Sequence, residues 1–215
     1  MSTIERRLLP AEEMPLDVEE REGGLPIIRG MAAVYNKPSR DLGGFREVIL
    51  PGAFDHILER KYKKMDVVAL WNHDANQLLG RTSSGTLRLS SDERGLKYEL
   101  DPPATTLARD LMTLVRRSDV FGSSFAFTVS NDDQSYDETP EGTVRTIRKV
   151  SGLYDVSLVT NPAYLDTQVA VRSFEEYKAA RDAELEPERM PALKLRLLRS
   201  KALARAACLK FRRLA

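Results

Sequence analysis

A β-strand is predicted at Phe121-Gly122-Ser123-Ser124-Phe125-Ala126-Phe127, an apolar segment in which two serines follow a glycine. Neighbouring residues of a strand face opposite sides. Ser123 therefore shares a face with the two phenylalanines that follow it, whereas Ser124 shares the other face with Ala126. The small alanine leaves room for a substrate, so Ser124 is the better candidate for a nucleophile. Because no GxSxG motif surrounds it, two structural serines are the plainer alternative.

A serine hydroxyl near its ordinary pKa is a poor nucleophile and needs an adjacent base. The chain has two histidines, His56 and His73. His73 follows the apolar run 66–71, so we expect it on the end of a strand, before a polar turn. A histidine ordinarily has a pKa of about 6.5, which makes it the readiest base near neutral pH. The alternative is a structural histidine bonded to a loop carbonyl. His56, on the polar side of a predicted helix, is a weaker candidate.

Asp155 is a charged residue within the apolar run 153–159. Regular alternation places it on the same face as Leu153 and Ser157. A carboxylate there is costly to bury unless it is paired. Pairing with an imidazole N–H would satisfy it and would hold His73 in the tautomer that accepts the serine proton. The alternative is an aspartate at the rim of a sheet, capping a turn.

An acyl-transfer site also needs donors for the oxyanion. The candidates are backbone N–H groups around the nucleophile, where Ser123 and Phe125 flank Ser124, and the side chain of Arg81, shortly after the histidine segment. Weaker candidates are Arg145 and Arg148.

Segments typical of strands recur along the chain, at residues 25–35, 45–50, 85–90, 95–100, 143–150 and 153–160. Helices are expected for about ten residues from Pro51 and at residues 105–117, and the acidic segment 130–142 predicts a long loop. Many short strands with two helices predict a mainly β fold of the α+β class. We expect an antiparallel β-barrel, closed or partly open, flanked by helices.

Composition excludes several classes of protein. The chain has 215 residues, a net charge of +1, one cysteine and two histidines, so a disulfide framework is ruled out and a zinc site is not expected. No apolar stretch approaches the ~20 residues that span a bilayer. The first residues lack the apolar core of a signal peptide. We expect a soluble protein in a reducing compartment.

Charge and composition divide the chain into three parts. Residues 1–24 are charged and irregular, which predicts a mobile or loosely packed arm, and residues 25–172 carry the strand patterns. Residues 173–215 begin as an acid-rich linker and end in a basic tail, residues 189–215, with leucines at helical spacing. Such a tail typically contacts an acidic partner or nucleic acid, although a solvated amphipathic helix is the alternative.

Six short motifs occur in order: Pro51-Gly52-Ala53-Phe54, Trp71-Asn72-His73-Asp74, Leu79-Gly80-Arg81, Gly95-Leu96, Gly122-Ser123-Ser124-Phe125-Ala126-Phe127 and Asp155-Val156-Ser157-Leu158-Val159-Thr160-Asn161-Pro162-Ala163-Tyr164. Together they resemble the tailed-phage prohead maturation protease family, which is similar in fold to the herpesvirus capsid maturation proteases. The resemblance covers roughly residues 25–172.

The resemblance implies a serine endopeptidase that needs no metal or cofactor. By position it assigns the histidine of the family to His73, the nucleophile to Ser124 and the third member to Asp155, where the herpesvirus relatives have a histidine. It also implies a narrower site, because Phe125-Ala126 replaces the Ile-Gly that is common in the phage family.

The resemblance also implies the setting. Members of the family act inside the assembling procapsid, in the host cytoplasm, where they cut scaffold or the scaffold-like arm of the major capsid protein, and themselves. A homo-oligomer is expected from the herpesvirus relatives. The tail would tether the protease to its substrates, and residues 130–142 and 173–190 are the expected cut sites.

Two other functions remain open at this point. One is a non-catalytic capsid assembly or scaffold factor of the same fold that acts through its basic tail. The other is a nucleic-acid module that uses residues 189–215, a reading that the scarcity of aromatic residues in the tail disfavours.

Overall fold

The computed structural model describes residues 4–9, 16–22, 26–59, 65–160, 171 and 174–183. The chain forms two compact units, Met1–Val171 and Arg172–Ala215. In the second unit residues 174–183 are helical. The predicted basic tail, residues 189–215, and the last motif residues, 161–164, lie outside the described residues.

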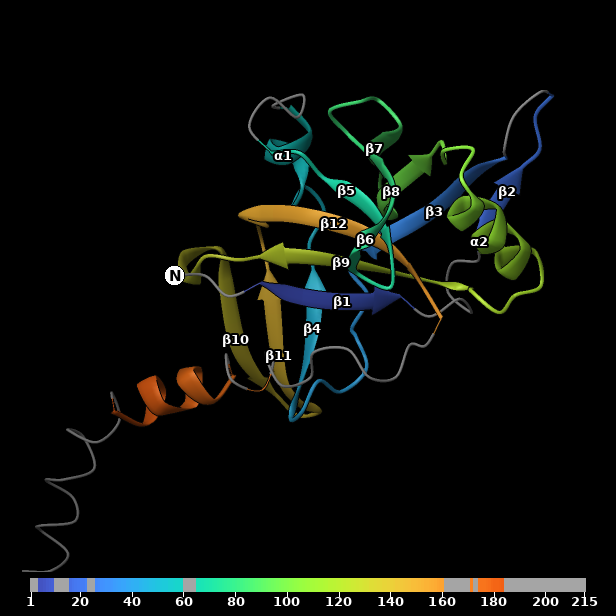
Figure 1. Ribbon diagram of the computed structural model, residues 1–215. Coiled ribbons are helices and arrows are strands. Elements are labelled where there is room, and N and C mark those ends of the chain that lie inside the picture. The colour runs from blue at the N-terminus through green and yellow to red at the C-terminus, as the bar shows by residue number, and fades with distance from the viewer. Residues whose placement is uncertain are drawn as a thin grey trace, which may run out of the picture. The chain divides into compact units, whose positions relative to one another are not determined.

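Three β-sheets build the first unit (Figure 1). The five-stranded sheet has the order β1 (Glu5–Leu9), β9 (Gly122–Thr128), β12 (Gly152–Val159), β5 (Val68–Trp71), β6 (Asp74–Arg81). The three-stranded sheet consists of β10 (Gln134–Thr139), β11 (Gly142–Ile147) and β4 (Phe45–Ile49). The four-stranded sheet consists of β2 (Asp17–Glu19), β3 (Ile27–Val34), β8 (Gly95–Leu100) and β7 (Leu87–Ser91).

The prediction of a mainly β protein with few helices is therefore confirmed. The expected barrel is not found closed among the described residues, whose ladders form three separate sheets. Two pairings, β12 with β5 and β11 with β4, are parallel, so the expectation of antiparallel strands throughout was wrong. Period-two alternation reports which face a side chain takes and says nothing of the direction of the neighbouring strand.

The described residues of the first unit form the helices α1 (Asp55–Glu59) and α2 (Thr106–Arg116) and the short 3-10 helix η1 (Asn131–Asp133). The Ala108 N–H donates to the Thr105 side chain at 3.3 Å, which caps the start of α2. No helix among the described residues is long and apolar enough to cross a membrane.

The core lies against one face of β9. Phe125 and Phe127 are buried there and stack with ring centroids 4.9 Å apart. The ring of Phe54, just before α1, meets Phe125 edge-on at 5.9 Å. β9 is thereby anchored by aromatic packing on this face, and its other face is left for smaller side chains.

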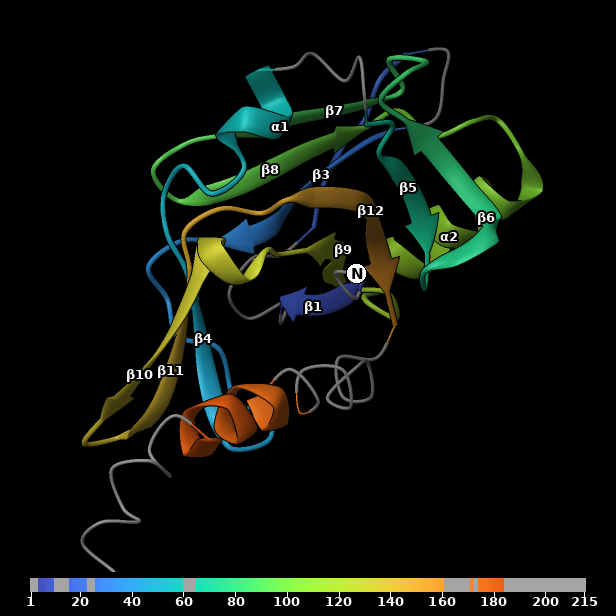
Figure 2. The same ribbon diagram turned by 90° about the vertical axis from the view of Figure 1, so that its left-hand side faces the viewer.

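The segment 130–142, predicted as a loop, contains strand β10, which pairs along its whole length with β11. The two strands form a hairpin beside β4 (Figure 2). These three strands run across the direction of β1, β9 and β12 (Figure 1). The sequence pattern did not predict this strand, β10, because its residues are polar and acidic and show little apolar alternation. Half of the strand is exposed.

The N-terminal residues 5–9, expected in a loosely packed arm, form strand β1 and pair with β9. Four charged side chains explain why. Glu5 and Arg7 on β1, Glu47 on β4 and Arg145 on β11 are all buried. Arg145 lies 2.6 Å from Glu5 and 2.8 Å from Glu47, and Arg7 lies 2.8 Å from Glu47. Residues distant in sequence therefore compensate charges that look solvated when β1 is considered alone.

The pKa values of Glu5, Arg7 and Arg145 in this four-charge cluster move toward the charged forms. Burial by itself raises the pKa of Glu5, but hydrogen bonds and charges from Arg145 and Arg7 outweigh it and lower that pKa. Burial by itself lowers the pKa of Arg145, but the carboxylates of Glu47 and Glu5 outweigh this effect, and the pKa is raised overall. These three groups are consequently ionised in the folded protein.

Candidate active site

Strand β9 separates its two serines onto opposite faces, as the alternation predicts. Ser124 pairs in register with Leu8 on β1 and Ser157 on β12, and it is completely buried. Ser123 lies on the core side, where its hydroxyl is 2.8 Å from the Tyr98 hydroxyl. Burial raises the pKa of Tyr98 to about 12, against the opposing effect of that hydrogen bond. Ser123 thus has a structural partner, and only Ser124 faces His73.

His73 lies in a tight turn between β5 and β6, and not on the strand where it was expected. Asn72 and His73 have φ values of 54° and 57°, and they join Trp71 and Asp74, which pair across the hairpin. Two consecutive positive φ values in a two-residue hairpin loop define a type I′ turn. Asparagine tolerates this left-handed conformation better than most residues, which accounts for Asn72.

Hydrogen bonds tie this turn to the end of β12. The Asn72 N–H donates to the Leu158 carbonyl at 2.9 Å, and the Asn72 side-chain oxygen accepts the Thr160 N–H at 3.1 Å. β5 also pairs in parallel with β12. The imidazole of His73 is therefore held over the β12 face that carries Asp155.

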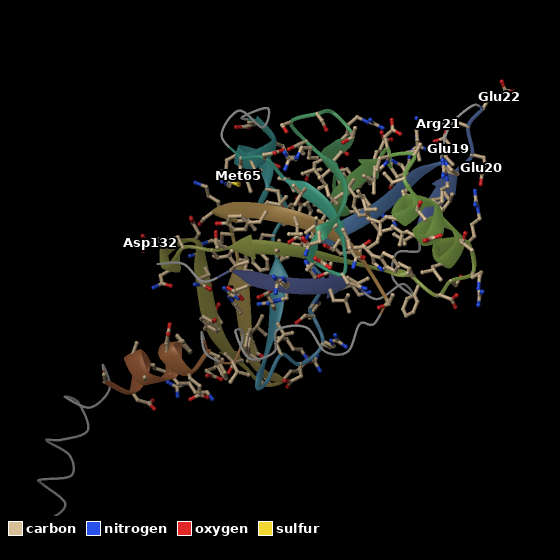
Figure 3. The ribbon with its side chains drawn as sticks, in the orientation of Figure 1. Glu19, Glu20, Arg21, Glu22, Met65 and Asp132 are labelled. Atoms are coloured by element: carbon tan, nitrogen blue, oxygen red, sulfur yellow. The ribbon has the colours of Figure 1, made fainter. Side chains whose placement is uncertain are left out.

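A β-bulge decides where Asp155 points. On β12, Leu153 pairs with Phe127 and Asp155 pairs with Ala126, so Tyr154 is an extra residue without a partner on β9. Leu153 consequently faces the core and Asp155 faces the opposite side with Ser157, and the expectation that Leu153 and Asp155 share a face was wrong. The Leu153 N–H donates to the sulfur of Met65, which Figure 3 labels at this end of β12. Bulges frequently re-aim side chains beside active sites in this way.

The three predicted residues meet through hydrogen bonds. His73 Nε2 lies 2.7 Å from Ser124 Oγ, and His73 Nδ1 lies 2.6 Å from Asp155 Oδ1. The side chains of His73 and Asp155 are 3% and 9% exposed. With the proton on Nδ1, the histidine donates to Asp155 and can accept the Ser124 hydroxyl. The candidate nucleophile, the candidate base and a group that can orient the base are thus in contact, and this arrangement suits acyl transfer.

A fourth polar side chain belongs to this group and was not assigned a role from sequence. Ser157 Oγ donates to Asp155 Oδ1 at 2.8 Å and lies 3.2 Å from His73 Nδ1. Its spacing of two from Asp155 on one strand was the available signal, because such residues share a face.

The predicted side chains for the oxyanion are not beside the nucleophile. Arg81 pairs with Val68 at the end of the β5–β6 hairpin away from the turn, and its guanidinium lies 3.4 Å from Asp66. Phe125 is in the core. Arg145 belongs to the four-charge cluster, and Arg148 donates to Ser135 and to backbone carbonyls. The backbone of residues 123–125, whose N–H groups were the other candidates, is paired with β1 on one side and β12 on the other. His56, the weaker candidate base, lies on α1.

Comparison with known proteins adds a family. The family model described as caudovirus prohead serine protease matches residues 13–180, a range that contains His73, Ser124 and Asp155. Among solved structures, the chain is similar to the capsid assembly protease gp21 of bacteriophage T4. The sequence identity is 13%, the TM-score is 0.45, and the match covers 73% of this chain and 99% of that chain. The comparison with curated proteins gave no match.

Proposed function

Because a family model matches most of its length, the chain belongs to the caudovirus prohead serine protease family, and we propose that it is a prohead maturation endopeptidase. It cleaves scaffold or the scaffold-like arm of the major capsid protein, and itself. The observation that carries the proposal is the pair of hydrogen bonds that joins His73 to Ser124 on one side and to Asp155 on the other.

The proposed mechanism follows from the atoms in contact. Ser124 Oγ attacks the peptide carbonyl while His73 Nε2 takes the hydroxyl proton. His73 then gives this proton to the leaving amine, and an acyl-enzyme remains on Ser124. Water hydrolyses it by the same route in reverse. Asp155 keeps His73 in the tautomer with a proton on Nδ1 and stabilises the imidazolium that forms.

The setting proposed for this reaction is the interior of the assembling procapsid in the host cytoplasm. The same proposal includes a homo-oligomer, a barrel-like enclosure of the strands, and tethering of substrates or nucleic acid by the basic tail. They rest on the resemblance to the phage and herpesvirus maturation proteases and on the tail's charge.

Co-expression with the major capsid protein of the same phage tests the activity. The wild type, Ser124→Ala and Ser123→Ala are compared by intact mass of both proteins. We expect shortened capsid protein and shortened protease with the wild type and with Ser123→Ala. We expect full-length masses with Ser124→Ala. Ser123→Ala is the matched control, since it removes a hydroxyl from the neighbouring residue of the same strand.

Each other pattern rejects a defined part of the proposal. If Ser123→Ala is the inactive variant, the chain is a protease but Ser124 is not its nucleophile. If all three proteins leave every mass full-length while procapsids still form, the chain acts as a non-catalytic assembly factor.

A further inference from the structure

Strand β12 buries two polar side chains on the face that His73 covers. Asp155 and Ser157 are both buried. A hydroxyl buried without a hydrogen-bond partner destabilises the fold, so Ser157 needs a partner. Its hydroxyl donates to the carboxylate of Asp155 at 2.8 Å. The Ser157 hydroxyl therefore donates to the same Asp155 oxygen that lies within hydrogen-bond distance of His73.

Asp155 Oδ1 accepts two donors, His73 Nδ1–H at 2.6 Å and Ser157 Oγ–H at 2.8 Å. The third side of this triangle, from Ser157 Oγ to His73 Nδ1, is 3.2 Å. The two distances from Nδ1 decide the roles. The shorter contact leads to the charged oxygen, and hydrogen bonds to charged acceptors are the stronger ones. Nδ1–H thus goes to Asp155, and Ser157 acts as a donor beside it.

Resting on the proposed function, we propose that Ser157 is a positioning residue for the same reaction. Asp155 follows directly after the bulge at Tyr154, where the regular ladder is interrupted. A carboxylate at such a position can rotate about its side-chain bonds. The Ser157 hydroxyl holds Oδ1 toward the imidazole and closes the space along the ring edge. The orientation of His73, and with it the direction of Nε2 toward Ser124, depends on this third side chain.

The tautomer of His73 reports this role without any substrate. The probe is the full-length chain in the Ser124→Ala background, which prevents self-cleavage, labelled with ¹⁵N-histidine. Only two histidines contribute signals, and His56→Gln assigns them. We expect one His73 tautomer, with the proton on Nδ1, in this parent protein. Ser157→Ala is expected to give a mixture of tautomers, and Ser157→Thr, which keeps the hydroxyl, to restore the single form.

Ser151→Ala is the matched control, since it removes another hydroxyl just before β12, one that accepts the Ser130 N–H outside this group. It should leave the spectrum of His73 unchanged. In the chain that retains Ser124, Ser157→Ala should lower kcat for capsid-protein cleavage roughly 10- to 100-fold with little change in KM, the range expected when a base is misplaced by about an ångström.

The two measurements separate this inference from the proposed function. A tautomer mixture in Ser157→Ala supports the positioning role, whether or not any peptide is cut. An unchanged single tautomer overturns it, even if the wild type proves to be an active protease. Equal kcat for wild type and Ser157→Ala also overturns it.

Discussion

The substitution Arg145→Met should destabilise the protein more than any surface change, because it opens the four-charge cluster. Arg145 is 1% exposed, and its guanidinium lies 2.6 Å from Glu5 and 2.8 Å from Glu47. Methionine fills much of the arginine stem volume but carries no charge. Two buried carboxylates would then share one cation, Arg7.

The expected cost is set by the carboxylate left without its partner. Removing one member of a buried ion pair typically costs about 3–5 kcal/mol. Domains of this kind have a total unfolding free energy of about 5–15 kcal/mol, so a large share is lost. With an m-value of about 2 kcal/mol/M, the urea midpoint should fall by about 2 M.

The assay is urea unfolding at neutral pH in the Ser124→Ala background, so that self-cleavage does not interfere. Arg148→Met is the matched control. Arg148 lies just after β11 and its hydrogen bonds are exposed, so its loss should cost at most about 1 kcal/mol. The double variant Arg145→Met/Glu5→Gln removes the uncompensated charge and leaves Arg7 paired with Glu47. It should therefore be more stable than Arg145→Met alone.

The stability of the protein at acid pH gives an independent test of the role of Glu5. The folded-state pKa of Glu5 is lowered, so its contribution to stability is present above the unfolded-state pKa and is lost as pH falls through the folded-state value. Arg145→Met should weaken this acid dependence. The reasoning is refuted if Arg145→Met costs no more than Arg148→Met, or if adding Glu5→Gln destabilises it further.

Three further outcomes are expected. Burial raises the pKa of Tyr98 from 10.0 to about 12, so roughly 3 kcal/mol of stability should be lost as the pH rises from 10 to 12. Tyr98→Phe should flatten that part of the curve of urea midpoint against pH. Equal slopes for both proteins would contradict this expectation. Asp155→Asn should lower capsid-protein cleavage by about 10⁴-fold with little change in melting temperature, because an amide no longer selects the productive His73 tautomer; a drop below tenfold would remove Asp155 from the mechanism. Asn72→Val should cost about 1–3 kcal/mol because its φ is 54°, whereas Asn72→Gly should cost less, since glycine adopts this φ freely; equal melting temperatures for the two variants would argue against the type I′ turn.

Part of the candidate site could be predicted because it depends on local geometry. A strand sends successive side chains to opposite faces, which separates Ser123 from Ser124 without knowledge of any partner strand. A carboxylate in an apolar run needs a partner wherever the run is buried, which drew attention to Asp155. The scarcity of histidines left His73 as the evident base.

The remainder required contacts between distant residues. The bulge at Tyr154 shows only in the pairing of β12 with β9, and it reverses the face that regular alternation assigned to Leu153 relative to Asp155. The turn at His73 depends on how β5 meets β6, and its place over Asp155 depends on the parallel pairing of β5 with β12.

The candidate residues of the site and the alternation of the strands could therefore be read from the sequence, since both follow from side-chain type and a backbone period of two. Contacts between distant residues were needed to show that β1 belongs to the sheet, that Glu5 and Arg145 compensate each other, and that Ser157 joins Asp155 and His73. The physical reason is that register, bulges and the pairing of buried charges are set by the free energy of long-range contacts, which no local pattern encodes.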